Sequence, residues 1–190
     1  MRVLVVYATR HGSTQQIAER IADRLREHSL DVTLRSADRA DEDVAAYDAA
    51  IIGSAVYAAH WLKDAAELVR RSGTALASRP VWLFSSGPLG ANSTDANDRE
   101  VRESAKPREY AEFSEAIHPR DHHVFFGAYD PVSDPVGIME TFLKLVPGGR
   151  TGLPDGDFRD WDEIDGWAAR IADALSATPD DEATAGTSGG

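Results

Sequence analysis

The feature that most constrains the fold is a series of short apolar runs, each bounded by glycine, serine, proline or charged residues. They recur at residues 3–7, 49–52, 81–84 and 124–126, with a shorter run at 32–34. A strand that is buried on both faces needs such an unbroken run, whereas a half-exposed strand alternates apolar and polar residues. These segments therefore predict strands inside a sheet that is covered on both sides.

The segments between these runs have helical periodicity. Ile17, Ile21 and Leu25 recur every four positions within residues 14–27, which places them on one face of a helix. We expect further helices at 62–77, at about 98–117 with an interruption at Pro107, and at 161–175. Strands that alternate with helices predict a doubly wound α/β fold, in which right-handed crossovers join a parallel sheet.

Composition narrows the possible functions. The 190 residues include no cysteine, which excludes disulfide frameworks, iron–sulfur clusters and cysteine nucleophiles, so that redox chemistry would need a bound cofactor. The formal charge of -12 repels phosphate backbones, and we expect no nucleic-acid partner. No pair of histidines has the spacing of metal ligands, so we expect no metal site.

The two ends of the chain differ in character. The first apolar run is too short for a signal peptide or a membrane span, and we expect a cytoplasmic protein without stable membrane insertion, although peripheral contact with a membrane stays open. Residues 1–177 are predicted to form one domain. Residues 178–190 are acidic and small, and we expect them to form a disordered tail.

The loop after the first strand has the composition of an anion site. Thr9, Ser13 and Thr14 supply hydroxyls and Gly12 supplies conformational freedom, while the helix that follows directs its positive end at the same point. An ordinary polar turn capped by Ser13 or Thr14 is the alternative. The loop matches neither a P-loop nor a dinucleotide fingerprint. A mononucleotide phosphate is therefore the favoured ligand.

The same segment resembles the opening of flavodoxins. The pattern has two aliphatic residues, an aromatic one, a hydroxyl, a small residue, a threonine, an alanine and an aliphatic residue, here Val5, Val6, Tyr7, Thr9, Gly12, Thr14, Ala18 and Ile21. The resemblance implies a flavodoxin-like three-layer sandwich, in which a five-stranded parallel sheet of order 2-1-3-4-5 carries helices on both faces. It also implies FMN at the point where the strand order reverses. The phosphate would then be held by Thr9, Arg10, His11, Gly12, Ser13 and Thr14.

Two further loops follow the third and fourth long strands, where the flavin ring of such a protein would lie. The candidate residues of the first are Ser54, Ala55, Val56, Tyr57, His60 and Trp61, and those of the second are Ser85, Ser86, Gly87, Pro88, Leu89 and Gly90. Small residues would let the backbone approach the flavin, and an aromatic ring would stack on it. The alternatives are core packing for Tyr57 and Trp61, and an ordinary turn for 85–90.

Histidines add a candidate for proton transfer. His11 and His60 lie in the proposed cofactor loops, where an imidazole can bind phosphate or flavin or relay a proton. We take His60 as the candidate catalytic residue. His122 and His123 are expected only to lead into the last strand.

About thirty residues separate the last strand from the last helix, which is more than a minimal flavodoxin has. This excursion, residues 128–160, contains an apolar face formed by Ile138, Met139, Phe142, Leu143, Leu145 and Val146. It would either cover the edge of the sheet or act as a lid beside the flavin.

With residues 53–55 and the Gly148-Gly149 turn, the excursion resembles flavodoxin-domain proteins related to menaquinone-dependent protoporphyrinogen IX dehydrogenase. That resemblance implies electron transfer between an organic substrate and a quinone. Acidic residues outnumber basic ones in the excursion, and this balance fits porphyrin propionates poorly. The alternative function is a flavodoxin-type electron carrier, whose negative charge would steer a basic redox partner. Oligomeric state is not predicted.

Overall fold

The computed structural model describes residues 1–40, 44–87, 102, 106–129 and 156–177. The predicted tail at 178–190 and the apolar face within 138–146 lie outside these residues, as do Pro88, Leu89 and Gly90.

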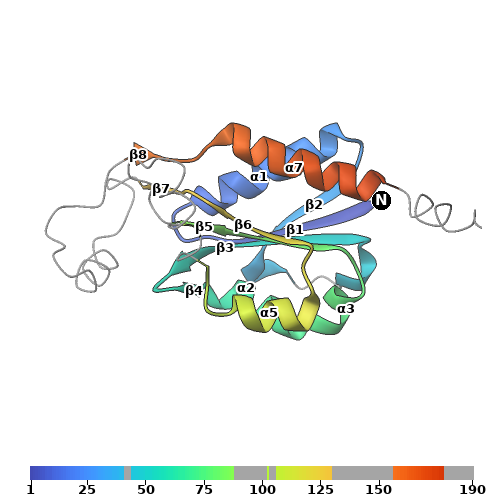
Figure 1. The fold of residues 1–190 in the computed structure, drawn as a ribbon, viewed down its shortest axis with the longest axis horizontal. Helices are drawn as coiled ribbons and strands as arrows, with labels where there is room; N and C mark the ends of the chain where they lie inside the picture. Colours follow the sequence, from blue (N-terminus) through green and yellow to red (C-terminus); the bar gives the residue numbers. More distant parts are fainter. Residues whose placement is uncertain (41–43, 88–101, 103–105, 130–155, 178–190) are drawn as a thin grey trace, which may run out of the picture.

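A parallel sheet forms the centre of the molecule (Figure 1). Its five long strands lie in the order β2-β1-β3-β5-β6. They are β1 (Arg2–Ala8), β2 (Asp31–Ser36), β3 (Ala49–Tyr57), β5 (Val81–Ser86) and β6 (Asp121–Phe125). Counted by the long strands alone, this is the order 2-1-3-4-5, so the predicted fold is confirmed.

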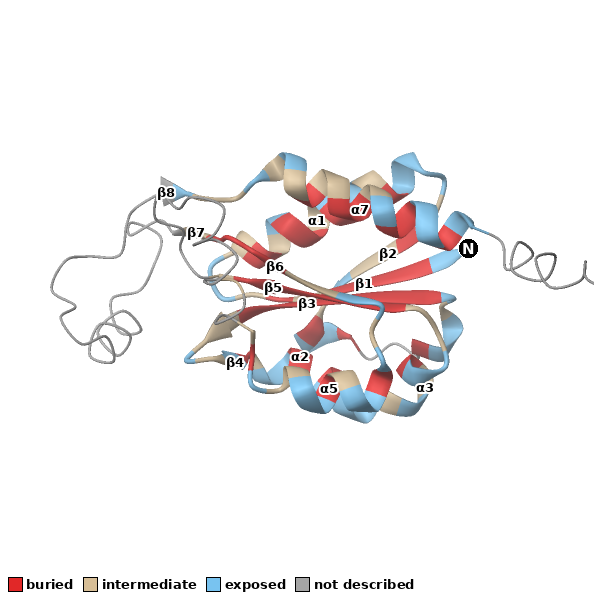
Figure 2. Cartoon of the chain, viewed as in Figure 1, coloured by how far each residue is buried: buried red, intermediate tan, exposed pale blue. Residues whose placement is uncertain are grey.

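Helices cover both faces of the sheet, as Figures 1 and 2 show. One face carries α1 (Ser13–Glu27) and α7 (Trp161–Ser176). The other face carries α2 (Lys63–Arg71), α3 (Gly73–Ala77) and α5 (Tyr110–Ile117), together with the 3₁₀ turns η1 (Ala37–Arg39) and η2 (Val44–Ala46).

The apolar runs explain why the sheet is covered twice. Successive strand residues point to opposite faces, and in β1 Val3 and Val5 pack with α1 and α7 while Leu4 and Val6 pack with the helices on the other side. All four are at most 1% exposed. An unbroken apolar run thus fills two cores at once.

Gly53 shows a close approach inside the sheet. It lies opposite Phe84 in the β3–β5 register, and a Cβ at this position would come within 2.0 Å of the Phe84 ring. The ring therefore occupies the space that a side chain at position 53 would need.

One helix prediction needs correction. The helix expected at 62–77 is divided into α2 and α3 at Ser72, because serine and the glycine that follows it have low helix propensity. In the segment expected from about 98, α5 begins at Tyr110, just after Pro107, which is consistent with the predicted interruption.

Two short antiparallel strand pairs were not expected. His60–Trp61 forms β4, which pairs antiparallel with the end of β3. β7 (Ala128–Tyr129) pairs with β8 (Gly156–Asp157), so that the two ends of the excursion are joined at its base.

Candidate cofactor site

Three loops meet at the edge where the parallel strands end, which is where open α/β sheets bind ligands. They follow β1, β3 and β5. The Gly87 N–H donates to the Phe125 carbonyl at 3.1 Å. A Cβ on Gly127 would lie 3.6 Å from the Gly87 nitrogen and 3.7 Å from Ser13 Oγ. The ends of β5 and β6 and the start of α1 are therefore in contact.

The first loop, residues 9–14, is folded by its own polar groups. Thr9 Oγ1 accepts a hydrogen bond from the Gly12 N–H at 3.0 Å, and Gly12 adopts φ 85°, a left-handed conformation. Its carbonyl accepts the first helical bond, from the Gln16 N–H. Within the described residues no side chain caps α1, and its first turn has no acidic residue. Helical N–H groups thus point toward an anion position.

Ser13 links this loop to the excursion. Its Oγ accepts a hydrogen bond from the Ala128 N–H at 3.0 Å, at the first residue of β7. The expected alternative, in which Ser13 or Thr14 caps the helix, is not what the structure has. Thr14 is only 1% exposed, so it is buried.

Positive charge lies beside the loop, although the whole chain is acidic. Arg10 and His11 are exposed, and the Arg10 guanidinium carbon lies 4.9 Å from the centre of the Tyr57 ring. The His11 and Tyr57 rings are 6.3 Å apart. Tyr57 is partly exposed, so the first two loops meet around its ring.

The second loop is the tight hairpin between β3 and β4. Tyr57 pairs with His60 across a two-residue turn, in which Ala58 has φ 51° and Ala59 has φ 65°. Two successive left-handed residues match a type I′ turn, which usually contains asparagine or glycine. Because alanine lacks this preference, the sequence carried no hairpin signal.

Several predicted cofactor residues are buried and already bonded. Ser54 Oγ donates to the Ala55 carbonyl and accepts from the Leu62 N–H. The Trp61 indole N–H donates to Ser85 Oγ at 2.9 Å, and its ring packs 5.4 Å from that of Phe113. Trp61 is 4% exposed and both serines are 0% exposed. These side chains lie in the core, as the alternative reading of Trp61 held.

Four further candidates lie in the described parts of the second and third loops. Val56 is partly exposed, whereas Ala55 and Ser86 are buried. Gly87 has φ 111°, a conformation that a side chain would strain.

Glu109 is a polar neighbour of the hairpin that sequence analysis missed. Its Oε1 lies 2.7 Å from His60 Nδ1, and its Oε2 accepts a hydrogen bond from the Trp61 N–H at 3.3 Å. Burial opposes ionisation of this carboxyl, but the hydrogen bonds from His60 and from backbone N–H groups outweigh it and lower its pKa. The only signal in the sequence was a carboxylate next to the helix start after Pro107.

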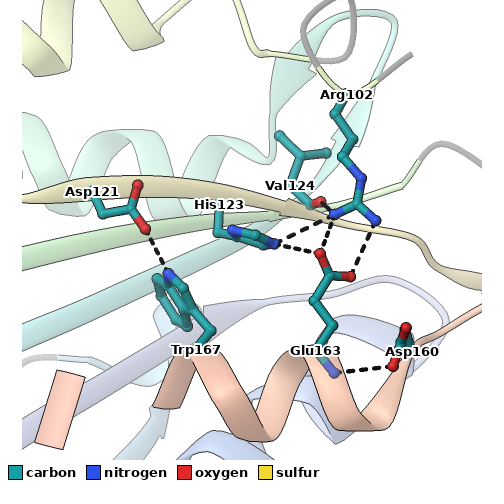
Figure 3. A network of polar contacts seen from close by, with 7 residues as sticks. All are labelled: Arg102, Asp121, His123, Val124, Asp160, Glu163 and Trp167. Atoms are coloured by element: carbon teal, nitrogen blue, oxygen red, sulfur yellow. Dashed lines mark hydrogen bonds and ion pairs between the residues drawn. The ribbon is translucent and has the colours of Figure 1, made fainter. Parts of the chain in front are cut away.

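His122 and His123 lie within β6 rather than before it, and each has a partner. His122 Nε2 is 2.9 Å from Ser85 Oγ, and its ring stacks on Tyr110. His123 Nε2 is 2.9 Å from Glu163 Oε1, in a network with Arg102 that joins β6 to α7 (Figure 3).

Among the residues that the structure describes, no three His, Asp or Glu side chains gather as a metal site would require. No helix in the same ranges is long and apolar enough to cross a bilayer.

Comparison with protein-family models decides the family, because a flavodoxin-domain model matches residues 4–132. The chain belongs to the flavodoxin-domain family. Solved structures agree on the fold. A flavodoxin from the domain Archaea superposes with a TM-score of 0.58 at 15% identity, over 93% of this chain and 100% of that chain. A cysteine-to-serine mutant of Pseudomonas aeruginosa flavodoxin gives 0.59 at 14% identity, with the same coverage.

Among curated proteins, the chain is similar to protoporphyrinogen IX dehydrogenase [quinone] of Escherichia coli strain K12. The two are 29% identical over 86 residues, which are 45% of this chain and 48% of that protein. The chain thus spans about half the length of the curated relatives that it matches.

FMN is the cofactor of the flavodoxin family, and the first loop of this chain fits its phosphate. A monoester dianion needs N–H donors and no nearby carboxylate. Here the uncapped start of α1 supplies the donors, and its first turn, which the structure describes fully, has no acidic residue.

Proposed function

We propose that this protein is an FMN-dependent oxidoreductase that transfers electrons between an organic substrate and a quinone-type acceptor. The observation that carries this proposal is the meeting of the three loops around an uncapped helix start in a flavodoxin-domain chain. The partial match to a quinone-linked dehydrogenase supports the choice of acceptor. Protoporphyrinogen IX is the substrate in that relative's name, and it is one candidate for the organic substrate here.

The proposed roles of the residues follow from their positions. The N–H groups that begin α1 and the Thr9 hydroxyl hold the phosphate, Arg10 adds positive charge, and the His11 ring can donate a hydrogen bond. The partly exposed ring of Tyr57 offers a face for stacking. His60, half exposed on β4, exchanges a proton with the reacting groups. Bound FMN supplies the ability to accept and pass on one or two electrons.

A flavodoxin-type electron carrier is the second candidate, and the charge of the molecule favours it. A net charge of -12 attracts a basic redox protein and speeds its encounter with the flavin edge. The two functions differ in their response to salt, because screening weakens attraction between charged proteins and hardly affects a neutral quinone.

In the deciding experiment, the FMN-loaded protein is reduced in the absence of oxygen. Its reoxidation is then followed by stopped flow at a series of increasing salt concentrations. One acceptor is menadione, a neutral quinone, and the other is cytochrome c, a basic redox protein. We expect rapid reoxidation by menadione at a rate that salt changes less than about twofold. Slow reaction with menadione, together with fast cytochrome c reduction that falls steeply with salt, would favour the carrier instead.

A further inference from the structure

The hairpin that carries His60 is fastened to the segment before α5 by three polar contacts. The Ala59 carbonyl accepts from the Arg108 N–H at 2.9 Å, and the two carboxylate oxygens of Glu109 contact His60 Nδ1 and the Trp61 N–H. One carboxylate thus holds both the backbone and the side chain of β4.

Glu109 is well placed to act as a charged acceptor. Its side chain is 12% exposed, whereas that of His60 is 50% exposed. The bonds from His60 and Trp61 hold its pKa below the usual range of a glutamate in spite of burial. An ionised carboxylate only accepts hydrogen bonds, so the contact of 2.7 Å requires a hydrogen on Nδ1 of His60.

The contact therefore selects one tautomer of the neutral ring. With the hydrogen on Nδ1, the atom left to bind and release a proton is Nε2, on the opposite side of the ring from Glu109. A histidine free in water prefers the other tautomer. Carboxylates orient imidazoles in the same way in hydrolytic triads and metal sites.

We propose that Glu109 is a positioning residue that fixes the His60 ring and presents its Nε2 as the proton-exchanging atom of the flavin site. This inference rests on the proposed function, in which His60 lies beside the reacting groups. Reduction of a quinone to a quinol takes two electrons and two protons. The two electrons and one hydrogen come from the reduced cofactor, and the second proton comes from Nε2 of the His60 imidazolium, which then regains a proton from solvent.

Glu109→Gln tests the positioning role with a clear structural expectation. In this variant the Trp61 N–H should donate its hydrogen bond to the carbonyl oxygen of the new amide. The amide NH₂ then faces Nδ1 of His60. Nδ1 must then accept, so the hydrogen moves to Nε2. Glu112→Gln is the matched control, because Glu112 lies on α5 and pairs with Arg70 instead.

The first readout needs no cofactor. Nitrogen-15 NMR of the His60 ring in the apoprotein, at a pH well above the usual imidazole range, distinguishes protonated from unprotonated ring nitrogens. We expect hydrogen on Nδ1 in the unmodified protein and in Glu112→Gln, and on Nε2 in Glu109→Gln. Hydrogen on Nε2 in the unmodified protein would overturn the positioning role, whether or not any variant folds.

The second readout compares two acceptors of the FMN-loaded protein. Menadione takes up protons on reduction, whereas ferricyanide takes up electrons only. We expect Glu109→Gln to lower the ratio of the menadione rate to the ferricyanide rate about tenfold, as loss of an orienting partner does elsewhere. His60→Gln should lower it at least as much, and the double variant no further.

The outcomes separate this inference from the proposed function. An unchanged ratio in Glu109→Gln, with an active unmodified protein, overturns the inference and leaves the proposed function standing. An unmodified protein that binds FMN and reduces neither acceptor overturns the proposed function and the role of His60 in it. The NMR measurement still decides in that case whether Glu109 orients the ring.

Discussion

Gly12 is the residue on which the phosphate loop depends. Its φ of 85° lies in the left-handed region, and it lets the loop close onto Thr9 before α1 begins. A Cβ at this position would meet no atom within 4 Å. The need for glycine here is thus conformational rather than a matter of space.

We therefore expect Gly12→Ala to weaken FMN binding about tenfold. The strain of a left-handed alanine is about 1–2 kcal/mol, and the loop can relieve it only by abandoning the conformation that directs its N–H groups at the phosphate. Riboflavin, which lacks the phosphate, should bind equally well to both proteins. Fluorescence titration of the apoprotein with each flavin measures the two affinities.

Gly73→Ala is the matched control, because Gly73 also begins a helix with open space around its Cβ and its φ is not positive. It should leave both flavin affinities unchanged. Equal loss of riboflavin and FMN binding in Gly12→Ala would contradict a phosphate role for the loop.

The loops follow from the sequence, but the partners of their side chains do not. Trp61, Ser54 and Ser85 stood out because they follow strand ends, yet their hydrogen bonds lie within the core. Ser85 meets His122, which is 37 residues away, and His60 meets Glu109, which is 49 residues away. Contacts of this range depend on the register of the strands, which no local pattern reveals.

Among the elements, the buried strands were the most predictable. Their apolar runs are needed on both faces, so pattern and structure coincide. The β3–β4 hairpin was not predictable, because Ala58 and Ala59 adopt a turn that other residues favour. The ends of helices fell between these cases, since the start of α5 followed from Pro107 while the break at Ser72 did not.

The contact between β6 and α7 is stabilised by a network of side chains that are far apart in the sequence. Arg102 donates to both oxygens of Glu163, at 2.5 and 3.1 Å, and to the Val124 carbonyl on β6 (Figure 3). Burial opposes ionisation of Glu163, but the hydrogen bonds from His123 and Arg102 outweigh it and lower its pKa. The network therefore favours the ionised carboxylate and stabilises the fold.

We expect Glu163→Gln to lower the free energy of unfolding at neutral pH by about 1–2 kcal/mol. Because the pKa is lowered in the folded state, the contribution of Glu163 is complete above the usual glutamate pKa of about 4.5. It is lost as pH falls through the lower, folded-state value. The variant should thus lose less stability than the unmodified protein on acidification through this window.

Urea unfolding at a series of pH values tests this difference. Asp162→Asn is the control, because Asp162 is exposed in the same helical turn and should cost only a few tenths of a kcal/mol through the helix dipole. Parallel stability curves for Glu163→Gln and the unmodified protein would contradict a stabilising role for the ionised carboxylate.

For the whole molecule, an acidic chain carries its candidate site at one edge of a doubly covered sheet. The excursion that separates this chain from a minimal flavodoxin leaves the sheet at β7 and returns at β8, next to Ser13 of the phosphate loop. The described ends of the excursion therefore lie beside the cofactor loops.

The central claim is that these loops form an FMN site, and titration of the apoprotein with FMN tests it most directly. Absorbance and calorimetry together give the stoichiometry, and mass spectrometry of the released chromophore gives its identity. The account predicts one FMN per chain and tighter binding than riboflavin. A protein that is colourless after incubation with excess FMN and removal of the unbound flavin would contradict the account and leave only the fold.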